Sequence, residues 1–298
     1  MPTAVLFPGQ GSQSPGAGQP WFDDPAWTVI ERAEAVLNEP LAPLVLDPAA
    51  DLSRTRESQL SVLLLSLLAW EAARTHVDHA VAFAGHSLGQ ITALIAAGVV
   101  TLDDGIAIAA DRAAATQRAA DANPGGLAAL LGATEEQAAD ACAAAPGSGW
   151  VANLNAPGQV VIEGTPDGLT AAAERAGALG VRRVRRLAVG GAFTPHGPAT
   201  AALAPTLERV TYTAPLEPVV TNHGGGPARP TGGLPACAHL VEPVRWQASV
   251  ELLVAMGVDR VVEVGPGTTL TSLVARIAPD LSVRHIAGPT DVSAWRAA

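Results

Sequence analysis

Short apolar runs alternate with longer, partly apolar stretches along most of the chain. Residues 3–7, 80–84 and 260–264 are mainly apolar runs that each end at glycine or proline, which predicts buried strands stopped by turns. Stretches of helical length and period predict helices over 26–37, 59–75, 90–97, 102–120, 246–256 and 269–277. This alternation of strands and helices predicts an α/β fold with a mostly parallel sheet.

The middle of the chain follows a different pattern. After a break at Asn123-Pro124-Gly125-Gly126, the sequence predicts, in order, a strand at 127–131, a helix at 134–144, strands at 150–153 and 159–163, a helix at 165–178 and a strand at 181–189. This β-α-β-β-α-β order is typical of a ferredoxin-like unit. We therefore predict a small subdomain of residues 122–189, inserted into a large subdomain of residues 1–121 and 190–298. Further on, residues 205–216 and 224–235 are rich in turn residues and are predicted as loops.

Length and composition restrict the class of protein. With 298 residues, of which 48% are hydrophobic and 15% are charged, the chain is long enough for one large domain and too apolar for disorder. Its net charge of −10 argues against nucleic-acid binding, which needs a basic surface. All 18 basic residues are arginine, so chemistry that needs a lysine amine, such as Schiff-base formation, is excluded.

Neither the cysteines nor the apolar segments indicate export or membrane insertion. Cys142 and Cys237 are far apart and form no Cys-x-x-Cys motif, which is typical of a reduced compartment. The first residues form no basic and apolar leader, and the apolar run 62–70 is too short to cross a bilayer. We therefore expect a cytoplasmic protein without membrane association. No metal site is predicted, since His76 and His79 have no third ligand nearby in the sequence.

The strongest candidate for chemistry is Gly85-His86-Ser87-Leu88-Gly89, which fits the pattern Gly-x-Ser-x-Gly. Between an apolar strand and a helix, this pattern favours a nucleophile elbow, in which the glycines allow a sharp turn that exposes Ser87 Oγ. The backbone N–H of Leu88 then points to the place where an oxyanion develops. The alternative is an ordinary strand-to-helix turn with a capping serine.

A serine nucleophile needs a general base, and spacing alone does not select one of the histidines. His86 is too close in the chain to be chosen on first principles, and His76 and His79 precede a strand at a predicted surface turn. His285 lies in a late apolar strand and fits a buried core residue. Histidines in turn-rich segments, where catalytic groups tend to lie, are the better candidates: His196, His223 and His239.

Several motifs, taken in order, resemble one enzyme family. They are Pro8-Gly9-Gln10-Gly11-Ser12-Gln13, the serine motif at 85–89, Asn155-Ala156-Pro157-Gly158-Gln159-Val160-Val161-Ile162, Pro243-Val244-Arg245-Trp246 and Glu263-Val264-Gly265-Pro266-Gly267. Together they closely resemble the malonyl-CoA:acyl carrier protein transacylases, and the acyltransferase domains of polyketide synthases share this signature. The resemblance covers nearly the whole chain. It implies an α/β-hydrolase-like large subdomain with a ferredoxin-like insertion.

The resemblance also implies roles for single residues. Ser87 matches the nucleophile that takes the acyl group from coenzyme A, and the backbone N–H groups of Gln10 and Leu88 match the oxyanion hole. Arg112 matches the arginine that binds the free carboxylate of malonyl, a role that suits a planar guanidinium, whereas the alternative is an ordinary surface arginine. Three further positions match substrate-binding residues, of which the last also fits a turn former: Gln59, His86 and Asn155.

Three positions depart from the family pattern. Gln90 stands where the family has glutamate, which removes a charge but keeps a hydrogen-bonding side chain. His239 replaces a glutamine that acts through its main-chain carbonyl, so this change is tolerable. Thr194 occupies the place of the family's basic histidine, and His196 follows two residues later. Residues two apart in extended chain point to the same side, so His196 is predicted to act as the base. The other interpretation is that the base is lost and the protein is slow or inactive.

The predicted activity is transfer of a malonyl or related carboxyacyl group from coenzyme A to the phosphopantetheine thiol of an acyl carrier protein, through an acyl-serine intermediate. No cofactor is expected, because the coenzyme A thioester is a substrate, and the pathway, fatty acid or polyketide synthesis, stays open. The basic run Arg182-Arg183-Val184-Arg185-Arg186 either steers an acidic carrier or is an ordinary solvated strand.

Two rival functions are consistent with the same motifs. One is a hydrolase that clears acyl groups from carrier proteins, although a hydrolase of simple acyl groups has no need for the carboxylate-binding Arg112. The other is an inactive homologue that only binds a carrier protein. Labelling of Ser87 by malonyl-CoA distinguishes an enzyme from a binding protein.

Overall fold

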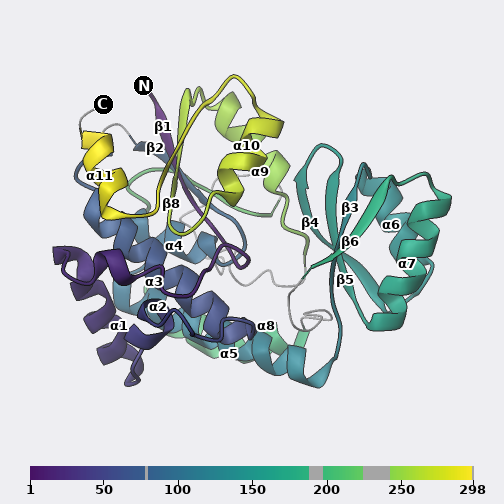
Figure 1. Cartoon of the computed structure of the whole chain (residues 1–298), viewed down its shortest axis with the longest axis horizontal. Helices are drawn as coiled ribbons and strands as arrows, with labels where there is room; N and C mark the ends of the chain where they lie inside the picture. The colour runs from purple at the N-terminus through teal and green to yellow at the C-terminus, as the bar shows by residue number, and fades with distance from the viewer. Residues whose placement is uncertain (78–79, 188–196, 224–241, 297–298) are drawn as a thin grey trace.

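A five-stranded parallel sheet runs through the larger part of the molecule, in the order β7-β2-β1-β8-β9 (Figure 1). The structure is a computed structural model that describes residues 1–77, 80–187, 197–223 and 242–296. The strands of this sheet are β1 (Thr3–Phe7), β2 (Ala80–Gly85), β7 (Val219–Val220), β8 (Arg260–Val264) and β9 (Ser282–Ile286). Because β1 is central and each of its residues is buried, its sequence is nearly all apolar rather than alternating.

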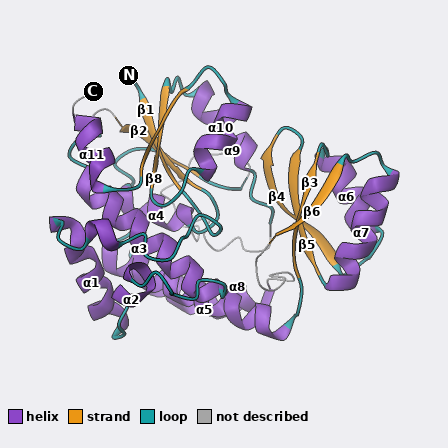
Figure 2. Ribbon diagram, in the orientation of Figure 1, coloured by secondary structure: helices purple, strands orange, loops and turns teal. Residues whose placement is uncertain are grey.

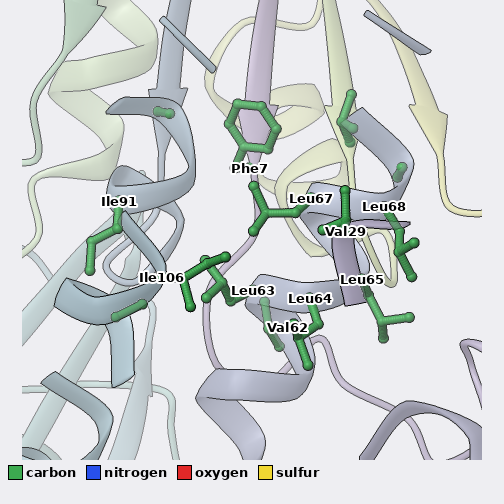
Figure 3. Close-up of a cluster of buried hydrophobic side chains, with 14 of the residues drawn as sticks. Phe7, Val29, Val62, Leu63, Leu64, Leu65, Leu67, Leu68, Ile91 and Ile106 are labelled. Atoms are coloured by element: carbon green, nitrogen blue, oxygen red, sulfur yellow. The ribbon is translucent and has the colours of Figure 1, made fainter. Parts of the chain in front are cut away.

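Helices cover both faces of the sheet. Alternate residues of β1 point to opposite faces, so Val5 and Phe7 belong to one core and Ala4 and Leu6 to the other. Figure 3 shows Phe7 of the first core close to Leu67. That core contains α1 (Thr28–Leu37), α2 (Ala42–Leu46), α3 (Thr55–Ala73), α4 (Gly89–Ala96), α5 (Leu102–Ala122), α8 (Gly197–Arg209) and α11 (Pro289–Arg296). The second core contains α9 (Trp246–Ala255) and α10 (Thr269–Ile277). Two short 3-10 helices, Gln19–Trp21 and Pro25–Trp27, precede α1.

A separate antiparallel sheet forms the smaller part of the molecule, with the strand order β4-β5-β3-β6 (Figure 2). Its elements follow the predicted order: β3 (Gly126–Leu131), α6 (Glu135–Ala143), β4 (Gly149–Ala156), β5 (Gln159–Gly164), α7 (Pro166–Ala178) and β6 (Arg183–Leu187). Both helices pack on one face of this sheet. The predicted α/β fold class, with a parallel sheet and a ferredoxin-like insertion, is confirmed. The boundaries at residues 122 and 189 stay a prediction.

The edge strand β4 joins the small sheet to the rest of the molecule. Val244 donates its N–H to the Ala152 carbonyl at 2.9 Å and accepts the Leu154 N–H at 2.8 Å, so it extends the sheet by one short pairing. Arg245 adds a two-pronged ion pair to Glu135, at 3.0 and 3.2 Å. The helices α6 and α7 lie on the side away from the large sheet (Figure 1). Among the described helices, none is both long and apolar enough to cross a membrane.

Two expectations about local structure are wrong. Residues 205–209 are not a loop, because α8 continues through Pro205 to Arg209. Leu203 and Leu207, one helical turn apart, are buried in the first core, and this packing outweighs the hydrogen bond that proline cannot donate. His285 is exposed on the edge strand β9 rather than buried. The predicted loop at 224–235 lies outside the described residues.

Candidate active site

Ser87 lies on a sharp turn between β2 and α4, at the carboxyl end of the parallel sheet. Its backbone φ is +53°, a conformation that residues other than glycine rarely adopt. The flanking glycines are required by close backbone contacts: a Cβ on Gly85 would lie 1.9 Å from the Gly89 carbonyl oxygen, and one on Gly89 would lie 2.1 Å from the Phe7 carbonyl oxygen. The strand, turn and helix that a nucleophile elbow needs are therefore all present.

Asn222, two residues after the end of the neighbouring strand β7, holds this turn in place. Its side-chain Oδ1 accepts the Ser87 backbone N–H at 2.6 Å, and its Nδ2 donates to the Gly85 carbonyl at 2.6 Å. Its own backbone N–H donates to Gln90 Oε1 at 2.7 Å. No motif in the sequence pointed to Asn222. The signal available was its place just beyond the end of a strand, because the carboxyl ends of parallel strands meet at one edge of the sheet.

We expect Asn222→Ala to lower the reactivity of Ser87 without unfolding the protein. The Ser87 N–H loses its acceptor, so the turn relaxes and Oγ moves from its position; a shift of about 1 Å costs on the order of 10²-fold in rate. The measurement is the rate constant for modification of Ser87 by a sulfonyl fluoride, followed by mass spectrometry. A variant that reacts as fast as the unmodified protein would show that the turn is rigid without Asn222.

Arg112 on α5 reaches the serine from the other side. Its Nη2 donates to Ser87 Oγ at 2.9 Å, and its Nη1 donates to Oε1 of Gln59 on α3. Gln59 is itself fixed, because its Nε2 donates to Thr116 Oγ1 at 2.9 Å. The arginine is 8% exposed and Gln59 is 2% exposed, so a cation is fixed next to the serine hydroxyl in a largely dry environment. A buried guanidinium in this position is suited to binding an anionic group of a substrate that Ser87 attacks.

The residue before the serine links the elbow to the small sheet. His86 Nε2 lies 2.9 Å from Oδ1 of Asn155 on β4, and the His86 ring lies 5.5 Å from the ring of Trp246. Burial lowers the pKa of His86 below its usual value of 6.5, and the nearby Arg112 charge lowers it further, while the bond to Asn155 acts in the opposite direction. A neutral His86 therefore donates its Nε2–H to Asn155 at neutral pH.

This lowered pKa gives an expected dependence of stability on pH. Below about pH 6.5 the unfolded chain takes up a proton on His86 that the folded protein still excludes, so the free energy of unfolding decreases as the pH falls. Above that pH His86 contributes nothing to the slope. We expect His86→Gln to reduce the loss of stability between pH 7.5 and pH 5.5 by up to about 1.4 kcal/mol per pH unit, measured by urea unfolding. An unchanged slope would mean that folding does not affect protonation of His86.

The loops around the elbow bring in the other predicted residues. Gln10 follows Gly9, where a Cβ would lie 2.5 Å from the His86 carbonyl oxygen, so this loop contacts the elbow directly. Leu88 directly precedes α4, at the helix N-terminus. The glycine motif after β8 supports the Gln10 loop: Gly265 has a φ of +133° and contacts Pro8, since an added Cβ would lie 3.0 Å from its ring.

The candidate bases are only partly covered by the described residues. His196, Thr194, His239 and His79 lie outside them. His223 is exposed, and its Nδ1 contacts the Glu242 carboxylate. His76 contacts its neighbour Thr75 on the surface, at 3.2 Å. In the described parts of the chain, no group of three histidine, cysteine or carboxylate side chains is arranged to hold a metal ion.

The fold and the site together define an acyltransferase: a serine at an elbow, next to a buried arginine, in an α/β fold with a ferredoxin-like insertion. Residues 5–289 match the acyl transferase domain family. The Malonyl CoA-acyl carrier protein transacylase of Salmonella typhimurium is 33% identical over 306 residues, which cover 98% of this chain and 97% of that protein. The chain belongs to the malonyl-CoA:acyl carrier protein transacylase family. The resemblance and the enzyme class predicted from the sequence are thereby confirmed.

Solved structures lead to the same family. An acyl-carrier-protein S-malonyltransferase from Burkholderia pseudomallei has a TM-score of 0.91 and 32% identity, with 100% of both chains covered. A malonyl-transacylase solved in complex with its type II polyketide synthase acyl-carrier protein also has a TM-score of 0.91, with 29% identity and coverage of 100% of this chain and 99% of that one. The similarity therefore extends over both sheets.

Proposed function

We propose that this protein transfers a malonyl group from coenzyme A to the phosphopantetheine thiol of an acyl carrier protein, through a covalent ester on Ser87. The observation that carries the proposal is the 2.9 Å contact between Arg112 Nη2 and Ser87 Oγ. In malonyl-CoA a single CH₂ group separates the carboxylate from the thioester carbonyl. A carboxylate bound to the Arg112 guanidinium therefore places the thioester carbonyl close to Ser87 Oγ. Coenzyme A enters as a substrate, and the chemistry needs no cofactor.

In the first half-reaction, Ser87 Oγ attacks the thioester carbonyl carbon as its proton passes to the base, for which we propose His196. The C–S bond then breaks, and the thiolate of coenzyme A leaves with that proton. The backbone N–H groups of Gln10 and Leu88 are the proposed donors to the oxyanion formed in between. In the second half-reaction the carrier thiol gives its proton to the base and attacks the ester. Ser87 regains its proton, and a thioester is again the product.

The experiment that tests the proposal is incubation with labelled malonyl-CoA, followed by mass analysis of the Ser87 peptide and of the products. Transfer predicts a malonyl adduct on Ser87 that passes to a holo-carrier protein faster than to water. Faster loss to water would instead favour a thioester hydrolase. The absence of an adduct with malonyl-CoA, acetyl-CoA or an acyl-carrier thioester would favour an inactive carrier-binding protein.

The acceptor we propose is the carrier protein of fatty acid or polyketide synthesis. A relative named malonyl CoA-acyl carrier protein transacylase is 33% identical to this chain, and the solved malonyl-transacylase in complex with a type II polyketide synthase carrier is 29% identical, so similarity does not select one kind of carrier. Comparing kcat/KM for holo-carrier proteins of the two kinds decides between them.

A further inference from the structure

The hydroxyl of Thr116 lies in the interior of the protein, one helical turn beyond Arg112 on α5. The helices α3 and α5 pack side by side (Figure 1), and the Gln59 side chain of α3 bonds to both Thr116 and Arg112. Thr116 is 3% exposed, and the other two side chains are buried as well, so water has little access to these bonds. The direction of each bond is therefore set by the protein itself.

A hydroxyl has one hydrogen to donate, and Thr116 uses it within its own helix. Its Oγ1 lies 2.9 Å from the Arg112 carbonyl oxygen and 3.1 Å from the Ala113 carbonyl oxygen, and a carbonyl oxygen can only accept. A bond of this kind, back to the preceding turn, is common for threonine inside a helix. Because the hydrogen is already used, Thr116 Oγ1 can only accept a bond from any further neighbour.

This restriction determines which way the Gln59 amide faces. Its Nε2 donates to Thr116 Oγ1 at 2.9 Å, and its Oε1 therefore faces Arg112 and accepts the bond from Nη1. A flipped amide would place its NH₂ group against the N–H groups of Arg112. Its oxygen would then face a hydroxyl that has no hydrogen left to donate. Thr116 thus excludes the flipped amide.

The Gln59 amide in turn orients the guanidinium of Arg112. The guanidinium is planar and rigid, so a bond that fixes Nη1 also fixes the direction of Nη2. In the structure Nη2 donates to Ser87 Oγ at 2.9 Å. The bonds form one directed series that runs from Thr116 through Gln59 and Arg112 to the nucleophile. Loss of the first acceptor is therefore expected to change the orientation of the guanidinium.

We propose that Thr116 is a positioning residue for acyl-donor specificity: its hydroxyl holds Gln59 so that the Arg112 guanidinium is oriented for the carboxylate of a carboxyacyl donor. This proposal rests on the proposed function. Thr116 acts through the other two side chains and is not a catalytic residue. A donor without a carboxylate depends much less on the orientation of the guanidinium, so the hydroxyl of Thr116 should matter mainly for carboxyacyl donors.

The test compares Thr116→Val with Thr116→Ser. Valine has nearly the shape of threonine without the hydroxyl, whereas serine keeps the hydroxyl and loses the methyl group. We expect Thr116→Val to lower kcat/KM for malonyl-CoA by about ten-fold, because the Gln59 amide loses its acceptor. The value for acetyl-CoA, measured with the same holo-carrier protein, falls far less. Thr116→Ser keeps most of the preference for malonyl-CoA. Thr116→Ala, which also lacks the hydroxyl, serves if the valine variant does not fold.

A double-mutant cycle tests whether Thr116 acts through Gln59. The variant Gln59→Leu has no amide to orient, so adding Thr116→Val should reduce the preference for malonyl-CoA no further. Two independent contributions would instead multiply in the double variant.

Gln117 provides a matched control for the packing of the two helices. It is the next residue on α5, and its Oε1 accepts the backbone N–H of Arg56 on α3 at 3.3 Å, while its Nε2 donates to Asp121 at 2.8 Å. It therefore links the same two helices through a different bond. Gln117→Ala is expected to leave kcat/KM for both acyl donors unchanged.

The proposal is wrong if Thr116→Val keeps the full preference for malonyl-CoA or lowers kcat/KM for both donors by the same factor. A loss in Thr116→Ser as large as that in Thr116→Val would assign the effect to the methyl group. Independent losses in the cycle with Gln59→Leu, or an equal loss in Gln117→Ala, would show that the substitution acts through helix packing. Failure of the proposed function is distinguishable, since the wild-type protein would then transfer no malonyl group or show no preference for malonyl-CoA over acetyl-CoA.

Discussion

Ser87→Ala is expected to abolish the malonyl adduct and to lower kcat/KM for transfer by on the order of 10⁴-fold or more. The reaction splits one transfer into two steps, one that forms the ester on Ser87 and one that breaks it, and both require the Ser87 oxygen. The fold tolerates the change, because alanine keeps the Cβ and the backbone N–H of position 87 still donates to Asn222 Oδ1. The measurement is the steady-state rate of carrier malonylation, with intact-protein mass spectrometry to detect the adduct.

A matched serine provides the control for this experiment. Ser293 lies exposed on α11, where its hydroxyl donates to the Pro289 carbonyl, and Ser293→Ala is expected to leave transfer unchanged. If Ser87→Ala kept the adduct on another residue, the nucleophile would lie elsewhere and the elbow would be a structural turn. If it lost the adduct but kept transfer, the thiol would attack malonyl-CoA directly without an intermediate.

The elbow could be predicted from sequence because each of its requirements leaves a local signature. Ser87 stands between glycines, after an apolar strand and before a helix, and the backbone contacts of Gly85 and Gly89 explain why no larger residue fits. The small sheet could also be predicted, since its strands and helices follow one another in the chain. Local order along the sequence was enough for both features.

The partners of the elbow left no such signature. Asn222 follows a strand of only two residues, β7, which is too short to show a periodic pattern. Its bonds to Gly85, Ser87 and Gln90 join segments more than 130 residues apart, so they exist only after the sheet has formed. The place of Gln59 beside Arg112 likewise depends on how α3 packs on α5, so only the resemblance to the family, and no pattern in the residues themselves, pointed to Gln59.

Arg112→Ala is expected to change which acyl group the enzyme accepts. Loss of the guanidinium removes charge-assisted hydrogen bonds to the malonyl carboxylate, each worth about 1.5–3 kcal/mol, so kcat/KM for malonyl-CoA should fall by roughly 10²- to 10³-fold. Acetyl-CoA has no carboxylate, and its kcat/KM should fall far less. The ratio of the two values, measured with the same carrier, is therefore the informative quantity.

Two further variants separate charge from packing. Arg112→Lys keeps a cation but loses the planar fork, so it should recover only part of the preference for malonyl-CoA. Gln59→Leu removes the bond that Arg112 Nη1 donates but keeps the guanidinium, and any loss it shows measures how much the orientation of the arginine contributes. Both variants are compared with wild type for thermal stability, because removing one partner of a buried hydrogen bond costs about 1–3 kcal/mol.

The decisive comparison is between the two acyl donors, because only specificity distinguishes a carboxylate clamp from a general support of the nucleophile. Arg112 donates to Ser87 Oγ in the absence of substrate, so it also affects the nucleophile itself. If its main role were to position Ser87, Arg112→Ala would lower kcat/KM for malonyl-CoA and acetyl-CoA by the same factor. If it binds the carboxylate, the malonyl preference disappears while acetyl transfer persists. Equal losses would therefore remove the basis for malonyl as the substrate while leaving Ser87 as the nucleophile.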